Sequence, residues 1–270
     1  MKFQKNNRAR VSGNITAVII HCGESTFQKS LESVQKQSIP VPIKVVKDVH
    51  PLPKALDKAL EICDTEWLVT IDADTILYRH ALMTLMKPIS PDIGAIIGKL
   101  RDRVYGVIGG VRLINAKILK EHGFRHPWDN PYPDRKAINF LEGLGLRRII
   151  LEEIVGEHNP YNTPFEAFRR FFGTYRKRGP VEQNAEFHFK AIINFAKRSG
   201  DFELAYFMMA GLICAALVDT SSPRDYIKDE QLYFFFEKIS KFYKKSERKT
   251  FIFPTLQNML WRIRCRLKKQ

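Results

Sequence analysis

Short apolar runs alternate with amphipathic segments through the first part of the chain. Strands are predicted where β-branched residues gather, in Ile15 to His21, Ile43 to Val46 and the run from Glu66 to Asp72. Between them, Phe27 to Gln37 and Lys54 to Cys63 carry apolar residues at helical spacing and predict helices. Strands and helices that alternate in this way favour βαβ units, so we expect an α/β fold with a mainly parallel sheet.

The alternation continues less regularly as far as Val155. Strand-like stretches are Gly94 to Gly98, Gly106 to Ile114 and Arg147 to Val155, and helices are predicted at His80 to Met86, Lys117 to His122 and from Asp134 to Gly143 or Gly145. The pair Gly109-Gly110 lies inside one strand-like stretch. Glycines at such a position let the backbone approach a ligand or another strand.

The last third of the chain has a helical pattern. Apolar residues recur at helical spacing in Phe165 to Arg178, Val181 to Arg198, Phe202 to Val218, Tyr226 to Lys245 and Leu256 to Leu267. We therefore expect three parts: a flexible basic tail over residues 1–14, an α/β domain over residues 15–180 and a helical C-terminal region over residues 181–270 that ends in a basic amphipathic segment.

Charge and cysteine usage narrow the partners and the compartment. The 270 residues include 44 Lys and Arg against 29 Asp and Glu, a formal net charge of +15, which favours a nucleotide, a nucleic acid or a phospholipid surface as partner. The four cysteines have no zinc or disulfide spacing, and residues 1–14 lack the apolar core of a secretory signal, so a cytoplasmic protein is expected. The uncharged run Leu204 to Val218 is shorter than the roughly 20 residues that span a bilayer, which favours a buried helix over membrane contact.

Two carboxylates follow the third predicted strand. Because side chains alternate along a strand, Asp72 and Asp74 point to one side and Ala73 to the other. Ligands of open α/β sheets collect at the carboxyl ends of strands, and a carboxylate pair suits Mg²⁺ or Mn²⁺ with a diphosphate. The alternative is an acidic turn after a core strand.

Further features follow this pair in a specific order. Gly109-Gly110 precedes a predicted helix, Gly123-Phe124 follows that helix, Asp134 opens the next helix eleven residues before Gly145, and His158 comes after the next strand. Together with the first strand and the alanine-rich helix before Asp72, this order resembles the family 2 glycosyltransferases of the GT-A fold. The resemblance covers roughly residues 15 to 178.

The resemblance implies an inverting, nucleotide-sugar-dependent glycosyltransferase with a Rossmann-type, mainly parallel sheet flanked by helices. By the family's pattern, Asp134 is the catalytic base. The same pattern assigns Asp72, Asp74 and His158 to a Mn²⁺ or Mg²⁺ ion that holds the diphosphate of the donor, for which a UDP-sugar is expected. The nucleotide-sugar-binding candidates are Glu24, Asp48, Lys54, Asp72 and Gly110.

Structural interpretations of the same residues stay open. Asp134 could cap its helix, His158 could be an exposed loop histidine, and Lys54 could be a solvated lysine at a helix end. Glu24 and Asp48 could simply cap the ends of their strands.

The expected reaction is transfer of a hexose or related sugar to a glycan or a lipid-linked saccharide. From Arg262 onward the chain has five basic residues and no acid, so residues 256–270 favour an anionic membrane surface and a peripheral place on its inner face. One alternative is glycosyl transfer to nucleic acid. The other is a catalytically inactive, membrane-peripheral binding module, because Pro133 stands where the family has Glu. A second departure from the family's pattern is His21-Cys22-Gly23-Glu24 in place of its usual Pro-Thr-Tyr-Asn.

Overall fold

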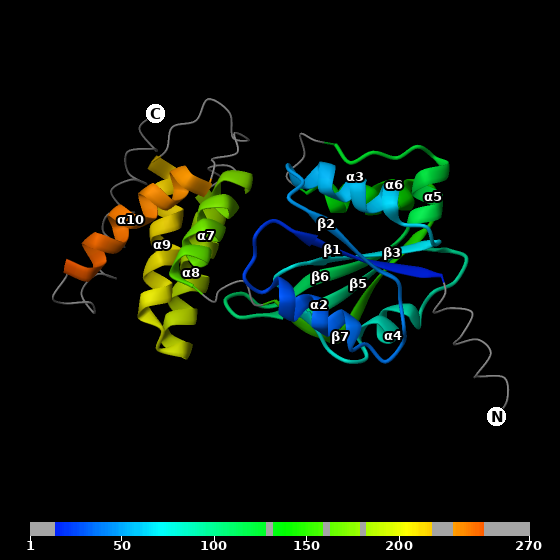
Figure 1. Cartoon of the computed structure of the whole chain (residues 1–270), viewed down its shortest axis with the longest axis horizontal. Coiled ribbons are helices and arrows are strands. Elements are labelled where there is room, and N and C mark those ends of the chain that lie inside the picture. The colour runs from blue at the N-terminus through cyan, green and yellow to red at the C-terminus, as the bar shows by residue number, and fades with distance from the viewer. Residues whose placement is uncertain (1–13, 128–131, 159–162, 179–181, 218–228, 246–270) are drawn as a thin grey trace. The chain divides into compact units, whose positions relative to one another are not determined.

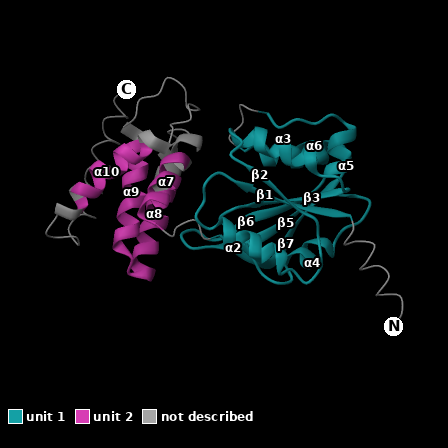
Figure 2. Cartoon of the chain, in the orientation of Figure 1, with its two compact units in different colours: residues 1–160 teal, residues 161–270 magenta. Residues whose placement is uncertain are grey.

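The computed structural model describes residues 14–127, 132–158, 163–178, 182–217 and 229–245 (Figure 1). Contacts within the chain divide it into two compact units, residues 1–160 and residues 161–270 (Figure 2). The predicted basic tail, apart from Asn14, and the predicted membrane-binding segment 256–270 lie outside the described residues.

A seven-stranded sheet forms the centre of unit 1, in the order β2-β1-β3-β6-β5-β7-β4. The strands are β1 Ile15–His21, β2 Ile43–Lys47, β3 Trp67–Asp72, β4 Thr75–Leu77, β5 Ile93–Asp102, β6 Gly106–Asn115 and β7 Arg147–His158. Strands β1, β2, β3, β5 and β7 run in one direction, whereas β6 and β4 run in the other. The expected α/β fold with a mainly parallel sheet is confirmed.

Helices cover both faces of this sheet because the side chains of each strand alternate between two apolar cores. Helices α2 Phe27–Gln35 and α4 Ala81–Met86 pack on one face, with alternate β1 residues such as Ala17 and Ile19. Helices α3 Leu52–Ile62, α5 Ala116–Glu121 and α6 Pro133–Gly143 pack on the other, with Val18 and Ile20 (Figure 1). The first three strands and the helices between them thus lie close to their predicted positions.

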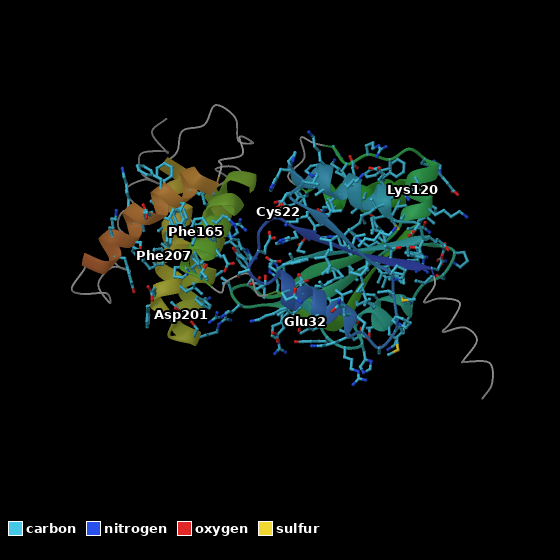
Figure 3. All side chains as sticks on the ribbon, in the orientation of Figure 1. Cys22, Glu32, Lys120, Phe165, Asp201 and Phe207 are labelled. Atoms are coloured by element: carbon cyan, nitrogen blue, oxygen red, sulfur yellow. The ribbon has the colours of Figure 1, made fainter. Side chains whose placement is uncertain are left out.

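Unit 2 consists of helices in its described part: α7 Pro164–Arg178, α8 Glu182–Ser199, α9 Phe202–Leu217 and α10 Asp229–Lys245. Its core is aromatic, with Phe168 and Phe172 of α7 packed against Phe207 of α9, and Figure 3 shows Phe207 and Phe165 among these helices. The predicted α/β domain over residues 15–180 includes α7, but the buried phenylalanines of this helix pack within unit 2. No helix in the described part of the chain is long and apolar enough to cross a membrane.

Candidate active site

The end of β3 is anchored so that two carboxylates project from it. Ala73 is buried, its amide donates to the Ile20 carbonyl at 3.0 Å, and its carbonyl accepts from the Thr26 hydroxyl at 2.9 Å. The chain on either side of this residue supplies Asp72, which is exposed, and Asp74, whose side chain is 20% exposed. The alternation predicted for this strand end is therefore present, with Ala73 turned into the core.

Asp72 shares its electrostatic environment with residues from other elements. Loss of hydration among the surrounding protein atoms raises the pKa of the Asp72 carboxyl, and the Asp74 carboxylate raises this pKa further. The residue nevertheless keeps contact with solvent. Arg112 of β6 and His158 of β7 act in the opposite direction, and Asp134 of α6 adds to the increase. These five side chains form one charge cluster at the carboxyl end of β3.

His158 lies between two aspartates. Its Nε2 is 3.2 Å from Asp74 Oδ1, and its Nδ1 is 2.7 Å from Asp102 Oδ2. It is the last residue of β7, where it pairs with Thr75 of β4 and with Asp102 of β5, and its side chain is only 12% exposed. The interpretation of His158 as an exposed loop histidine is therefore wrong, because β7 extends beyond its predicted end at Val155 and includes His158, whose side chain is mostly buried.

Asp102 is a member of the site that sequence reasoning missed. Its side chain has no exposed surface, and its Oδ1 accepts hydrogen bonds from the amides of Val104 and Tyr105, both at 2.7 Å. An aspartate before a glycine-containing turn is a sequence signal for this local cap. Its pairing with His158 carries no such signal, because the two residues meet only through the pairing of β5 with β7.

Asp134 lies in the first turn of α6 and contacts a strand. The N-cap residue of α6 is Tyr132, so the interpretation of Asp134 as the helix cap is wrong. Its Oδ2 instead lies 2.5 Å from Nη2 of Arg112, whose Nη1 donates to the Gly110 carbonyl at 3.0 Å. The start of α6 moves one residue earlier than predicted because Pro133 occupies its first position, which suits a proline.

The nucleoside candidates lie at the ends of neighbouring parallel strands. Glu24 follows β1, two residues after Cys22, which is labelled in Figure 3. The Glu24 carboxylate accepts a hydrogen bond from the Cys22 amide at 2.6 Å and lies 3.1 Å from His21 Nδ1. Asp48 follows β2, has a positive φ of 55°, and donates its amide to the His21 carbonyl at 2.9 Å. Both residues therefore cap the ends of their strands, as the structural interpretation expects. They lie at the same edge of the sheet as Asp72, because β1, β2 and β3 are parallel neighbours.

Two further candidates are placed by packing. Lys54 is exposed on the first turn of α3. A Cβ atom on Gly110 would lie 2.1 Å from Cδ1 of Leu100, so this glycine allows the side chain of the next strand to pack against it. The two roles considered for the glycine pair are approach to a ligand and approach to another strand. At Gly110, the structure shows close packing against the neighbouring strand β5.

The donor set at the end of β3 suits a hard divalent cation only in part. In the described residues, no group of three or more His, Cys, Asp or Glu side chains is arranged to hold a metal ion. Asp74 and His158 do offer a carboxylate oxygen and an imidazole nitrogen 3.2 Å apart, and both are ligands that Mn²⁺ accepts. These two side chains are only part of what a cation would need, and a bound anion would have to supply the remaining ligands.

Comparison with known proteins gives only distant likenesses. No family model and no curated protein matches the chain. Among solved structures, it is similar to the mannosyltransferase PcManGT from Pyrobaculum calidifontis in complex with GDP-Man and Mn²⁺, with 13% identity over 96% of this chain and 92% of that chain and a TM-score of 0.49. It is also similar to S. aureus TarS 1–349, with 11% identity over 74% of this chain and 80% of that chain and a TM-score of 0.43. A 4-diphosphocytidyl-2C-methyl-D-erythritol synthase from Anaerococcus prevotii aligns at 10% identity over 52% of this chain and 89% of its own, with a TM-score of 0.37.

Proposed function

We propose that the chain is an inverting glycosyltransferase that moves a sugar from a nucleoside-diphosphate sugar, a UDP-sugar by expectation, to a hydroxyl of a glycan or a lipid-linked saccharide. One observation carries the proposal: a strand-end carboxylate pair and an arginine-held carboxylate belong to the same charge cluster. The first group suits a cation and a diphosphate, and the second suits removal of a proton.

On the donor side, Asp72, Asp74 and His158 would hold Mn²⁺ or Mg²⁺ together with the donor diphosphate. The cation supplies charge stabilisation for the diphosphate that leaves. The raised pKa of Asp72 supports this role, because loss of hydration and then the neighbouring Asp74 carboxylate both disfavour its charged form, and a bound cation would offset that cost. Glu24 and Asp48, which follow the neighbouring strands β1 and β2, are the candidates for contacts to the nucleoside.

On the acceptor side, Asp134 is the base. Arg112 contacts its Oδ2, which fixes the direction of the carboxylate, and we assign Oδ1 to the acceptor hydroxyl. The acceptor oxygen forms a bond to the anomeric carbon while the bond from that carbon to the diphosphate breaks, and the hydroxyl proton passes to Asp134. Pro133, which stands where the family has Glu, begins α6 as a buried residue, and the charged group beside Asp134 is Arg112.

The first experiment separates donor binding from transfer. The purified chain with Mn²⁺ is titrated with nucleotide sugars by calorimetry, and release of the nucleoside diphosphate is followed with glycan, lipid-linked and nucleic-acid acceptors. We expect Asp74→Asn to weaken metal-dependent donor binding. Asp134→Asn should keep donor binding but lose transfer by about 10²- to 10⁴-fold, the usual contribution of a positioned base.

Asp92 provides a matched control for Asp134. Asp92 also pairs with an arginine, Arg147, at 2.6 Å. It lies just before β5, at the end of the strand opposite to Asp102 and therefore far from the site. Ten residues of strand span roughly 30 Å, so Asp92→Asn should leave transfer unchanged. Donor binding that is indifferent to metal and to Asp74→Asn, or full turnover by Asp134→Asn, would contradict the assignment.

A further inference from the structure

We propose that Asp102 is a positioning residue that holds the imidazole of His158 with Nε2 directed at Asp74 and at the cation bound there. The inference rests on the proposed function, because that function assigns a divalent cation to Asp74 and His158. It adds a residue outside the predicted site, and it explains why a carboxylate is buried at the end of β5.

Burial of Asp102 is matched by hydrogen bonds to both of its oxygens. The whole residue is 2% exposed, Oδ1 accepts from two backbone amides, and Oδ2 lies 2.7 Å from His158 Nδ1. An ionised carboxylate without such partners would be costly to bury. The contact is also set by the backbone, since Asp102 and His158 are register partners at the ends of the parallel strands β5 and β7.

The direction of the histidine follows from the chemistry of its partner. A carboxylate only accepts hydrogen bonds, so Nδ1 of His158 carries the hydrogen that lies between the ring and Asp102. In the neutral ring this leaves the lone pair on Nε2, the nitrogen that is 3.2 Å from Asp74. Metal-binding histidines commonly have this arrangement, with the second ring nitrogen donating to a carboxylate.

A purely structural role would assign Asp102 to the turn between β5 and β6. In that case only the bonds from Val104 and Tyr105 would matter. Asp102→Asn separates the two roles, because the Asn oxygen can keep both amide bonds while its NH₂ group replaces the oxygen that faces His158. That NH₂ group donates to Nδ1, so the ring hydrogen moves to Nε2 and blocks the lone pair needed for a metal.

The chain contains a second His–Asp pair that serves as a matched control. Nδ1 of the buried His126 lies 2.8 Å from Asp57 Oδ1, and the His126 amide donates to the same oxygen at 2.9 Å. Asp57 belongs to α3, and neither residue is part of the proposed metal site. Asp57→Asn therefore changes the same kind of hydrogen bond while leaving Asp74 and His158 as they are.

The test measures Mn²⁺ affinity, with and without UDP, by electron paramagnetic resonance of MnCl₂ titrated into wild type, Asp102→Asn and Asp57→Asn. We expect Asp102→Asn to weaken Mn²⁺ binding about 10- to 100-fold, the usual effect of removing a partner of a ligating histidine, and Asp57→Asn to leave it unchanged. Nitrogen NMR of the ring should show Nδ1 protonated in wild type and unprotonated in Asp102→Asn. The NMR measurement on wild type needs no variant to fold.

The outcomes separate this inference from the proposed activity. Loss of Mn²⁺ affinity in Asp102→Asn without any sugar transfer by wild type would support the positioning role and remove the transferase. Transfer by wild type together with unaltered Mn²⁺ affinity in Asp102→Asn would remove the positioning role alone. An unprotonated Nδ1 in wild type, or wild type that takes up no Mn²⁺ with or without UDP, would also overturn the inference.

Discussion

Gly110 allows a direct test of whether its missing side chain serves packing or a ligand. A Cβ atom at this position would lie 2.1 Å from Cδ1, 2.4 Å from Cγ and 3.2 Å from Cβ of Leu100, which is 2% exposed. On its other side, Cδ2 of Leu100 lies 3.1 Å from the position that a Cβ on Gly156 would take, so this leucine fills space left by both glycines. Gly110→Ala therefore forces a buried leucine or its strand to move.

The expected cost follows from this overlap. An extra methyl group in a well-packed core destabilises a protein by about 1–3 kcal/mol, so Gly110→Ala should lower the free energy of unfolding by that amount. Leu100→Ala alone should cost about 2–5 kcal/mol, because it removes a buried side chain and leaves a cavity. In the double variant the alanine at 110 fills part of that cavity, so the two costs should fall short of additivity by about 1–3 kcal/mol.

Urea unfolding of the two single variants and the double variant provides the measurement. The transition can be followed by fluorescence, to which the buried Trp67 of β3 contributes, together with circular dichroism to detect separate unfolding of the two units. Nucleotide-sugar binding is measured on the same samples. A Gly110→Ala variant that is as stable as wild type but binds no nucleotide sugar would refute the packing explanation and restore the ligand role.

Two predictions concern titratable groups. Loss of hydration and then the Asp74 carboxylate raise the pKa of Asp72 in the folded protein, so the native state binds more protons than the unfolded state as the pH rises above 3.8, and stability is lost across that window. Asp72→Asn should therefore raise the melting temperature at neutral pH, which scanning calorimetry at low salt would detect. An unchanged or lower melting temperature would contradict this. Burial lowers the pKa of His126 below its ordinary 6.5, more than Asp57 and Asp134 raise it, so the unfolded state binds more protons and stability falls as the pH drops below 6.5. His126→Asn should weaken this acid sensitivity, and urea midpoints at about pH 7.5 and 5.5 that change equally in both proteins would argue against it.

The parts of the fold that were predictable are those that short-range patterns determine. Apolar runs and helical spacing were sufficient for β1 to β3 and the helices between them, because α2 crosses over from β1 to β2 and α3 crosses over from β2 to β3. The environment of α7 was not predictable in this way. Its phenylalanines at helical spacing show that one face is buried, but the pattern contains nothing about which helices cover that face. In the structure, α9 and α10 pack against it.

The candidate site shows the same limit at the level of single contacts. The sequence places Asp72, Asp74 and Asp134 at the ends of elements, where local motifs locate them. It does not reveal Arg112 as the partner of Asp134, because that ion pair joins the middle of β6 to the first turn of α6. Nor does it reveal Asp102, which reaches His158 only after β5 and β7 have paired.

Strand direction explains why these acidic groups gather at one edge. Strands β3, β5 and β7 run the same way, so their last residues, Asp72, Asp102 and His158, come to a common edge, while the antiparallel β6 brings Arg112 beside Thr70 of β3. Four aspartates then face one arginine and one histidine, in a chain whose formal net charge is +15. Folding alone gives no reason to concentrate the minority charge at one place. Loss of hydration first, and the Asp74 carboxylate second, raise the pKa of Asp72 there. A local excess of carboxylates that is retained in a basic protein is what a cation-dependent phosphate site requires, and it is the physical ground on which the assignment rests.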